Sequence, residues 1–473
     1  MKATSLRARA SLEMKMKHDR NEPRQSGHDK RELAANIGST LVTRVIVMLI
    51  ALLSSVVLAR TLGPEGRGVF ALLLLLPSLA TNLGLLGFEQ ANAVYAGLAP
   101  GSRGILVWQS AAVALGVGGV VAAAGMAYFL AGAPGFEALA GAPTMLLLLL
   151  LATIPVRLVV EYWSAIVRGM NRIHLVNVVE VGTRVLSFSG ILILVKTLGF
   201  GVTGAALSDA AACIGAATIL AILLGSVRAW CRPTWDSDLW RRSATFAVTM
   251  HAGTVAAYLN YRVDEFIIAA LLPVEQLGLY AIAVGLVERI WIIPGSVANA
   301  LLPHLTNRRD TDPAVCAAIC RHVAIWTGAA CVFVFVAADP IVTTLFSSSF
   351  SAAVVPLRWL LPGIFTLSVE RVLVAELLAR EKARAIVWAA AGAVVANVVG
   401  NLLLVPRMGI SGASLASSIS YSIMSVVVGA YYLRVTGLSW KVLIPCVEDL
   451  STYKGLWRRM VRSEASSLPS LES

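Results

Sequence analysis

The sequence predicts an all-α integral membrane protein with about twelve transmembrane helices in two parallel six-helix lobes. The prediction rests on the composition, on the length of the apolar runs and on an internal repeat. Hydrophobic residues make up 57% of the 473 residues, charged residues only 14%, and the mean hydropathy is +0.76. A soluble domain has about 45–50% apolar and about 25% charged residues. A folded core cannot hide this excess, which excludes a soluble protein, a disordered chain and a collagen-like fibre.

Twelve apolar runs are long enough to cross a bilayer. A hydrocarbon core of about 30 Å needs about 20 residues of helix, and the helix is required because lipid offers no partner to free backbone groups. Gly and Pro residues separate the runs, as at Gly63-Pro64 and Pro134-Gly135. The predicted spans are 36–59, 68–96, 104–130, 143–167, 173–195, 203–227, 245–270, 277–303, 321–338, 355–379, 385–404 and 410–433.

The positions of the basic residues set the expected topology. With both termini cytoplasmic, 28 of the 39 Lys and Arg residues lie in cytoplasmic segments, seven lie within spans, and four lie outside, namely Arg60, Arg67, Lys196 and Arg407. This asymmetry follows the positive-inside rule, and one missed helix would destroy it. The net charge of +12 is therefore mainly an insertion signal. No nucleic-acid partner is expected.

The same scan divides the chain into five parts. We expect a cytoplasmic basic tail without a signal-peptide apolar region, two helical lobes joined by a cytoplasmic linker, and a basic amphipathic C-terminal segment. That last segment either lies on the anionic inner leaflet or is a solvated tail. In order, the parts are 1–35 (tail), 36–228 (N-terminal lobe), 229–244 (linker), 245–434 (C-terminal lobe) and 435–473 (amphipathic segment).

An internal repeat relates the two lobes. The segment LGPEGRGVFAL (62–72) aligns with LPVEQLGLYAI (272–282), and GVTGAALS (201–208) aligns with GISGASLA (409–416). The two offsets, 210 and 208 residues, are nearly equal. Because each half has an even number of spans, the halves share one orientation in the membrane, which is the parallel-repeat design of transporters whose lobes rock around a midplane site.

Arginines within the predicted spans are the main candidates for a substrate site. A charge at the membrane centre costs roughly 2.5–3.5 kcal/mol on insertion scales and marks function. Arg suits planar contacts with phosphate or carboxylate, so these residues predict a cationic cavity for an anionic head group. The candidates are Arg44, Arg157, Arg184, Arg262, Arg289 and Arg371.

Ion pairing is the structural alternative for some of these arginines. Arg157 and Glu161 are i, i+4 neighbours, and so are Glu180 and Arg184, so each pair could neutralise itself. Arg44 and Arg289 have no acid at helical i±3 or i±4 spacing and are the strongest functional candidates.

Four acidic residues are candidates for ion or proton coupling: Asp264, Glu265, Glu288 and Asp209. An interhelical salt bridge is an equally good interpretation. Six tryptophans in or near spans, Trp291 among them, are interpreted as interface or packing residues rather than sugar-stacking residues. The cysteines are interpreted as small buried hydrophobes, and we expect no metal site. Phosphate-loop, HExxH and GxSxG motifs are absent, which favours a transporter over an enzyme and indicates no cofactor beyond a coupling H⁺ or Na⁺.

Three segments resemble the polysaccharide transporter family, the Wzx-type lipid-linked oligosaccharide flippases, within the superfamily that also holds peptidoglycan lipid flippases and multidrug extruders. They are NIGSTLVTRVIVMLIALLSSVVLARTLGPEGRGVFAL (36–72), IIAALLPVEQLGLYAIAV (267–284) and LLLVPRMGISGASLASSISY (402–421). The resemblance extends over about 36–435, and Arg44 matches the first-helix arginine of the family.

The resemblance implies a V-shaped, alternating-access transporter in the bacterial inner membrane. Its implied substrate is an undecaprenyl-diphosphate-linked repeat unit for O-antigen, capsule or exopolysaccharide, and a polysaccharide polymerase and export machinery are implied protein partners. Three alternatives stay open: a cation-coupled extruder of the same fold, a membrane polymerase or ligase, and a scaffold. The intramembrane arginines disfavour cationic drugs, and short external loops disfavour the enzymes.

Overall fold

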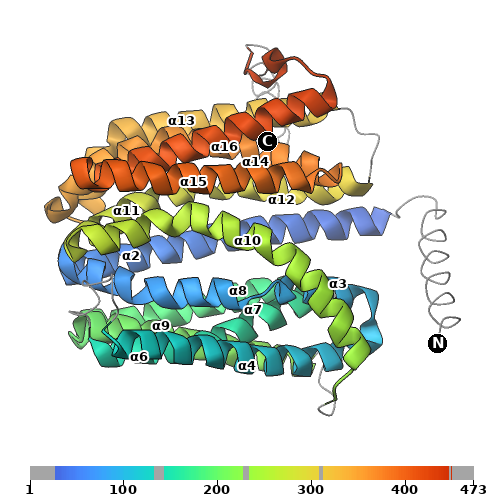
Figure 1. Ribbon diagram of the computed structural model, residues 1–473, viewed down its shortest axis with the longest axis horizontal. Helices are drawn as coiled ribbons and strands as arrows, with labels where there is room; N and C mark the ends of the chain where they lie inside the picture. The colour runs from blue at the N-terminus through green and yellow to red at the C-terminus, as the bar shows by residue number, and fades with distance from the viewer. Residues whose placement is uncertain (1–26, 133–142, 227–233, 308–312, 447–448, 450–473) are drawn as a thin grey trace, which may run out of the picture.

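The computed structural model describes residues 27–132, 143–226, 234–307, 313–446 and 449, and this part of the chain is helical without a strand (Figure 1). The predicted basic tail therefore lies mostly outside the described residues, as does the amphipathic segment beyond residue 449. The first half comprises α2 (Gly27–Gly84), α3 (Phe88–Leu98), α4 (Arg103–Leu130), α6 (Thr144–Ala152), α7 (Ile154–Gly169), α8 (Ile173–Gly190), the π-helix η2 (Ile191–Thr197) and α9 (Gly201–Ser226).

The second half begins with the long helix α10, and its helices α11 and α12 meet at a bend of 42°. It comprises α10 (Ser237–Leu271), α11 (Val274–Ile290), α12 (Ile292–Asn307), α13 (Pro313–Leu345), α14 (Val354–Ala379), α15 (Ala383–Met408) and α16 (Ile410–Thr436). Short 3₁₀ turns lie at Pro100–Ser102, Ser348–Ala353 and Trp440–Leu443.

Within the described residues, nine helical stretches are long and apolar enough to span a membrane, and the bent pair α11–α12 makes a tenth. The first stretch, Val42–Gly84, merges the first two predicted spans. α10 is also long enough, with 35 residues, but it carries Arg262, Asp264 and Glu265. Counting α10 and dividing the first stretch at Gly63 brings the number to the predicted twelve.

Gly63 is the point at which the first two spans separate. Its φ of 66° and ψ of −178° are not helical, so α2 is two helices joined at a kink. Glycine tolerates a positive φ because it has no Cβ, and Pro64 then starts the next helix with a pre-set φ.

Several predicted single spans are broken helices. The predicted span 68–96 is interrupted at residues 85–87, where Leu86 and Gly87 have positive φ, before α3 begins. The span 143–167 is divided at Thr153, one residue before the start of α7 at Ile154, which carries a Pro at its N-terminus. The span 277–303 bends by 42° between α11 and α12. Hydropathy averages over such breaks, so it predicts the approximate length of a span but not the breaks within it.

The linker prediction for 229–244 needs correction, because α10 begins at Ser237. Asp236 caps this helix, since its side chain accepts hydrogen bonds of 2.9 Å from the backbone N–H groups of Asp238 and Leu239. Trp240 then stacks on Phe88 of α3, with ring centroids 5.0 Å apart. The second half of the predicted linker is thus a helix packed on the N-terminal lobe.

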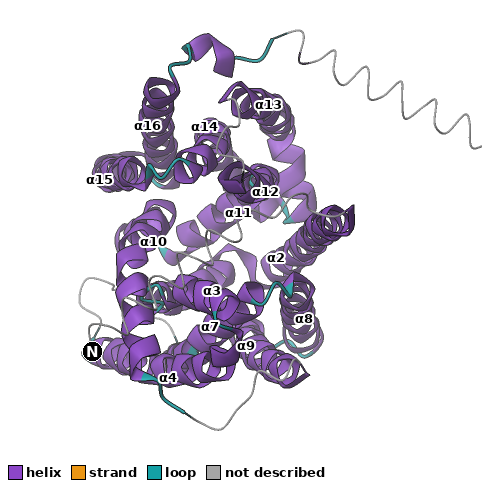
Figure 2. Cartoon of the chain, turned by 90° about the vertical axis from the view of Figure 1, so that its right-hand side faces the viewer, coloured by secondary structure: helices purple, strands orange, loops and turns teal. Residues whose placement is uncertain are grey.

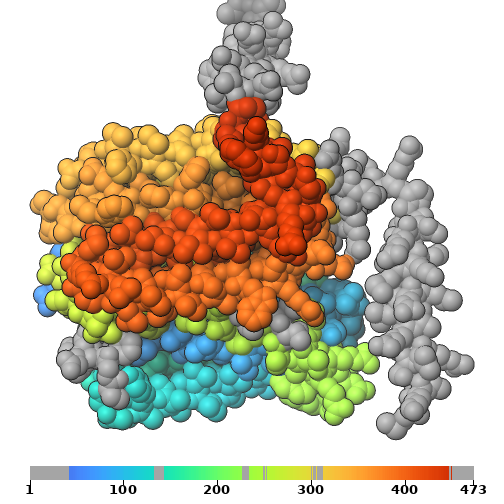
Figure 3. Space-filling view, turned by 45° about the horizontal axis from the view of Figure 1, so that its top comes forward, coloured from blue at the N-terminus to red at the C-terminus, as the bar shows by residue number. Residues whose placement is uncertain are grey.

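The helices form two lobes that lie against each other, with α13–α16 on one side and α3–α9 on the other (Figures 1 and 2). Helices α2, α10, α11 and α12 lie between these groups (Figure 2). α10 runs from the N-terminal lobe to the C-terminal lobe, where Asn397 of α15 donates a 2.8 Å hydrogen bond to the Asn260 carbonyl. The space-filling view shows the same order, with the α10 segment reaching down beside the first half (Figure 3).

The repeated segments pack against each other at the junction of the lobes. A Cβ on Gly68 would overlap the carbonyl oxygen of Val274, and a Cβ on Gly278 would overlap that of Pro64. Gly68 corresponds to Gly278 and Pro64 to Val274 in the repeat, so the contact is reciprocal. Close backbone approach through small residues is typical of membrane helix pairs. This α2–α11 crossing, at Gly68 and Gly278, joins the two halves at the end predicted to be extracytoplasmic.

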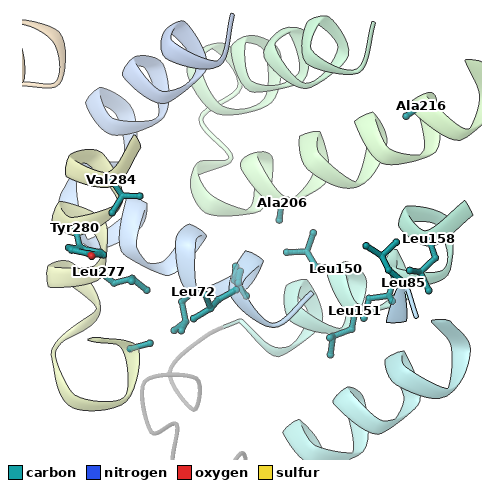
Figure 4. Packing of buried hydrophobic residues seen from close by; sticks show 14 of the residues in the cluster. Leu72, Leu85, Leu150, Leu151, Leu158, Ala206, Ala216, Leu277, Tyr280 and Val284 are labelled. Atoms are coloured by element: carbon teal, nitrogen blue, oxygen red, sulfur yellow. The ribbon is translucent and has the colours of Figure 1, made fainter. Parts of the chain in front are cut away.

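A continuous apolar core extends through this crossing. Leu277, Tyr280 and Val284 of α11 belong to the same buried cluster as Leu72 of α2 and the N-terminal lobe residues Leu150 and Leu158 (Figure 4). A second cluster fills the half of the C-terminal lobe away from this crossing and includes the fully buried Cys316 and Cys320, in agreement with the interpretation of these thiols as small hydrophobes. At the α2–α11 crossing the lobes are thus joined by packed apolar surface.

Candidate functional site

Charged side chains of α10 and α11 meet beside the junction of the lobes. Arg262 forms ion pairs with Glu265, three residues further along α10, and with Glu288 of α11, at 3.0 Å. The side chains of Arg262 and Glu288 remain 33% and 41% exposed, so the cluster is open on one side. Glu288 thus takes its partner from another helix and not from its sequence neighbour Arg289.

Two further arginines adjoin this group. Arg289 donates from Nη1 to the carbonyl of Gly285, and its Nε is buried without a hydrogen-bond partner among the described residues. Arg67 of α2 lies close enough to Glu265 and Arg289 to be influenced by both charges, and its Nε is likewise buried and unpartnered within the described ranges. Three arginines thus lie near the carboxylates of Glu265 and Glu288, and the Asp264 carboxylate acts on Arg262 as well.

Arg67 was expected outside the membrane, in a connection between the first two spans. The structure places it in the helical continuation of α2 after Gly63, next to the Gly68–Gly278 crossing. The connection is a kink at Gly63 and not a loop, and the position of Arg67 at the extracytoplasmic side stays a prediction. A sequence signal did exist, since Arg67 lies inside the repeated segment.

Arg371 of α14 occupies an aromatic environment. Its guanidinium lies over the Trp291 ring at 4.2 Å and over the Tyr261 ring at 5.7 Å, and its Nη2 donates to the Tyr261 hydroxyl at 3.3 Å. Cation–π contacts of this kind are stabilising where water is excluded. Trp291 was expected to be an interface or packing residue, but it sits between a guanidinium and a tyrosine at the α11–α12 bend.

The remaining arginines lie apart from this group. Arg157 pairs with Asp209 of α9 and not with Glu161, and its Nε donates to Thr153 at 3.0 Å. Arg44 is half-buried on the first part of α2, and Arg184 is exposed on α8. Neither Arg44 nor Arg184 forms an ion pair within the part of the chain that the structure describes. The six predicted arginines are therefore spread over both lobes.

Asp264 is the most buried of the predicted coupling acids, at 2% exposure. It accepts hydrogen bonds from the Tyr280 hydroxyl, from the Ser417 hydroxyl at 2.9 Å and from the Glu265 backbone N–H at 2.8 Å. Three donors from three helices hold this carboxylate, which satisfies a group that would otherwise be costly in the membrane.

A buried polar network continues from Asp264 between α10, α15 and α16. The Ser420 hydroxyl donates to Asn260 Oδ1 at 3.0 Å, and Asn401 donates to the Asn397 carbonyl at 2.9 Å. These four residues were not predicted from the sequence because none is charged. Their helical spacing could have indicated them, since Asn260 with Asp264, and Asn397 with Asn401, are i, i+4 pairs that share one face of an apolar helix.

Comparisons with known proteins agree with this architecture. A family profile described as "Polysaccharide biosynthesis protein" matches residues 33–307, which is more than half of the chain. Comparison with curated proteins gave no match.

Solved structures with the same fold cover nearly the whole chain. A lipid II flippase MurJ in an inward closed conformation has a TM-score of 0.69 and 13% identity, covering 87% of this chain and 89% of that one. An inward-facing multidrug resistance MATE transporter of the MOP superfamily has a TM-score of 0.67 and 14% identity, covering 84% and 98%. A MOP superfamily transporter from Pyrococcus furiosus has a TM-score of 0.63 and 13% identity, covering 85% and 95%.

These likenesses show that the chain shares the two-lobed fold of these transporters, and the family match is independent of them. With the matched region extending from α2 through α12, the chain belongs to the polysaccharide biosynthesis protein family.

Proposed function

We propose that the protein is a flippase that moves undecaprenyl-diphosphate-linked oligosaccharide repeat units across the bacterial inner membrane for surface polysaccharide assembly. The observation that carries the proposal is the charge cluster of Arg67, Arg262, Arg289, Glu265 and Glu288, in a member of a polysaccharide biosynthesis family. Its guanidinium N–H groups that lack a partner among the described residues suit a diphosphate.

The proposed mechanism is alternating access between two lobes. Arginines bind the diphosphate, with Arg289, beside the junction, and Arg44, on the first part of α2, as the main contacts and Arg157, Arg184, Arg262 and Arg371 as further candidates. The repeated α2–α11 crossing closes the outer end in the conformation described here, and its opening would release the substrate to the outer leaflet. A polymerase would then receive the repeat unit.

We further propose that Asp264 couples transport to an ion or proton gradient. This carboxylate joins α10, α11 and α16 through its hydrogen bonds, so protonation or cation binding there would change how these helices pack. Asp264→Asn should retain the fold and lose transport driven by a gradient.

Deletion and complementation test the flippase. Deleting the gene should trap lipid-linked repeat units on the cytoplasmic leaflet, and normal polysaccharide export in the deletion strain would refute the proposal. Complementation with Arg289→Gln or Arg44→Gln, at wild-type protein level, should restore less than about a tenth of export, because a charge-assisted contact is lost. Arg358→Gln is the matched control, since that exposed guanidinium bonds only to the Phe335 carbonyl and ring among the described residues.

The second candidate function is a cation-coupled extruder of small molecules. The buried carboxylate Asp264 favours it, because such a group could also drive export of a small solute. Restored drug tolerance in a pump-deficient host, without any effect on polysaccharide export, would favour the extruder over the flippase.

A further inference from the structure

Trp291 lies at an unusual place in the membrane fold, where α11 ends and α12 begins with a 42° bend. Its ring faces the Arg371 guanidinium at 4.2 Å and meets the edge of Tyr261 at 5.0 Å, with an interplanar angle of 69°. Tyr421 of α16 lies against the other side of Tyr261, with ring centroids 5.9 Å apart. Broken helices in transporters commonly form part of a binding site.

Several donors at this bend and on the adjoining part of α10 are buried and lack a partner among the described residues. They are the Trp291 indole N–H, the Arg371 Nε–H, the Arg289 Nε–H and, three residues before Tyr261 on α10, the Tyr258 hydroxyl. A native fold rarely leaves buried polar groups unpaired, so a group of them needs an explanation. Each of the four can donate, and three of them can only donate. A ligand that satisfies them must be rich in acceptor oxygens.

The surroundings of these donors distinguish a sugar from a phosphate. The rings of Trp291, Tyr258 and Tyr261 are only half-buried, so their faces remain partly accessible although their polar atoms are not. Flat aromatic faces next to a few convergent hydrogen-bond groups are typical of small-molecule pockets. The Arg371 guanidinium lies over two aromatic rings, the nearer at 4.2 Å, whereas the Arg67 guanidinium has a single ring, that of Phe70, at 5.8 Å.

We infer that Trp291, Tyr258, Tyr261 and Arg371 form a glycan-binding subsite, the aromatic subsite, that takes the sugar part of the substrate. The indole and tyrosine faces cover the apolar face of a sugar ring, and the unpartnered donors of Trp291, Tyr258 and Arg371 bind its hydroxyl or carboxylate oxygens. The diphosphate is left to the charge cluster around Arg67 and Arg289. This inference rests on the proposed flippase function and adds a division of the substrate between two sites.

Binding of two separate probes to the purified full-length protein in detergent tests the inference. The probes are undecaprenyl diphosphate without sugar, and the repeat-unit oligosaccharide released from the source strain's surface polysaccharide. Trp291→Phe keeps an aromatic ring and removes the N–H, and Tyr258→Phe removes only the hydroxyl. Trp388→Phe is the matched control, because Trp388 of α15 is 78% exposed on the outside of the bundle.

We expect Trp291→Phe and Tyr258→Phe each to weaken the binding of the oligosaccharide about tenfold, measured by ligand-dependent thermal shift. Binding of undecaprenyl diphosphate should stay unchanged. Three results would each overturn the aromatic subsite. They are wild-type-like oligosaccharide binding by the double variant Trp291→Phe/Tyr258→Phe, no oligosaccharide binding by the wild-type protein, and an equal loss of binding of both probes in the variants. Oligosaccharide binding that depends on Trp291, without any binding of undecaprenyl diphosphate, would support the subsite and refute the flippase.

Discussion

Ionisable residues in this membrane protein take their partners mainly from other helices. Arg157 of α7 bonds to Asp209 of α9 although Glu161 is one turn away, and Arg262 of α10 reaches Glu288 of α11. A pair along one helix needs no tertiary structure, whereas a pair between helices fixes their packing. Each pair has to be tested separately, because an arginine held in a structural ion pair and an arginine that binds substrate can both be charged residues of a membrane helix.

The Arg157–Asp209 pair gives the first test of this kind. Asp209→Asn should lower the free energy of unfolding by about 1–3 kcal/mol, because it leaves a half-buried guanidinium without its counter-charge. The double variant Arg157→Gln/Asp209→Asn should recover part of that loss. Thermal unfolding in detergent measures both. Export by the double variant decides the role: normal export assigns the pair to packing, and lost export with recovered stability assigns it to transport.

A second residue-scale test lies outside the membrane, where Asp449 fastens the segment after α16. Arg321 Nε donates to both carboxylate oxygens of Asp449, at 3.0 and 2.8 Å, and the Cys446 backbone N–H donates at 2.9 Å. These hydrogen bonds hold the pKa of Asp449 well below its ordinary value.

A carboxylate whose pKa is lowered by folding stabilises the protein above the pKa of the unfolded chain, about 4, and loses this effect as the pH falls through the folded value. Asp449→Asn should therefore lower the unfolding temperature at pH 7.5, by an amount that corresponds to about 1 kcal/mol. The difference from wild type should shrink at pH 3. An equal difference at both pH values would contradict the charge-assisted contact.

At the scale of elements, breaks and crossings organise the helices more than their lengths do. The first span ends at a single non-helical residue, Gly63, and the eighth bends at Trp291. The repeated segments meet only because neither Gly68 nor Gly278 has a side chain. The exposed Arg60 adds a contact near this crossing, since its Nε donates to the Leu345 carbonyl at the end of α13 at 2.8 Å. A positive side chain at a helix C-terminus is favourable.

Alanine at Gly68 or Gly278 should separate α2 and α11 at the outer end. The new methyl group would overlap a carbonyl oxygen of the opposite helix, so we expect a loss of about 2–4 kcal/mol and a large loss of export. Gly119→Ala in α4 and Gly392→Ala in α15 are controls, because nothing lies within 4 Å of their added Cβ. These controls should be neutral or slightly stabilising, since Ala favours a helix. Wild-type export by Gly68→Ala would show that the crossing does not matter for transport.

At the scale of the whole molecule, the distribution of basic residues predicts that one end of the bundle is cytoplasmic. Two exposed serines mark the two ends of the bundle. The prediction places Ser349, between α13 and α14, at the extracytoplasmic end and Ser439, after α16, at the cytoplasmic end. In intact spheroplasts a membrane-impermeant maleimide should label Ser349→Cys and leave Ser439→Cys unlabelled until lysis. Labelling of Ser439→Cys from outside would invert the topology and with it the assignment of the outer end.

The sequence by itself determined the fold class, the number of spans and the relation between the halves. These follow from short-range properties: apolar length sets a span because lipid excludes unpaired backbone groups, and the repeat is readable because both halves bury the same small residues. It also identified Arg262, Glu265, Glu288 and Arg289, because charge in an apolar run is visible without any structure. The prediction of about twelve spans in two lobes therefore required only the sequence.

Only the tertiary structure decided which side chains meet. Arg371 contacts Tyr261 across 110 residues, Arg157 takes Asp209 at a separation of 52 in preference to its helical neighbour, and Arg67 joins the charge cluster. The aromatic surroundings of Trp291 depend on a bend that hydropathy does not record. The physical reason is the same in each case: these contacts are between helices distant in sequence, and their geometry depends on how backbones approach and bend, which side-chain polarity along one helix does not specify.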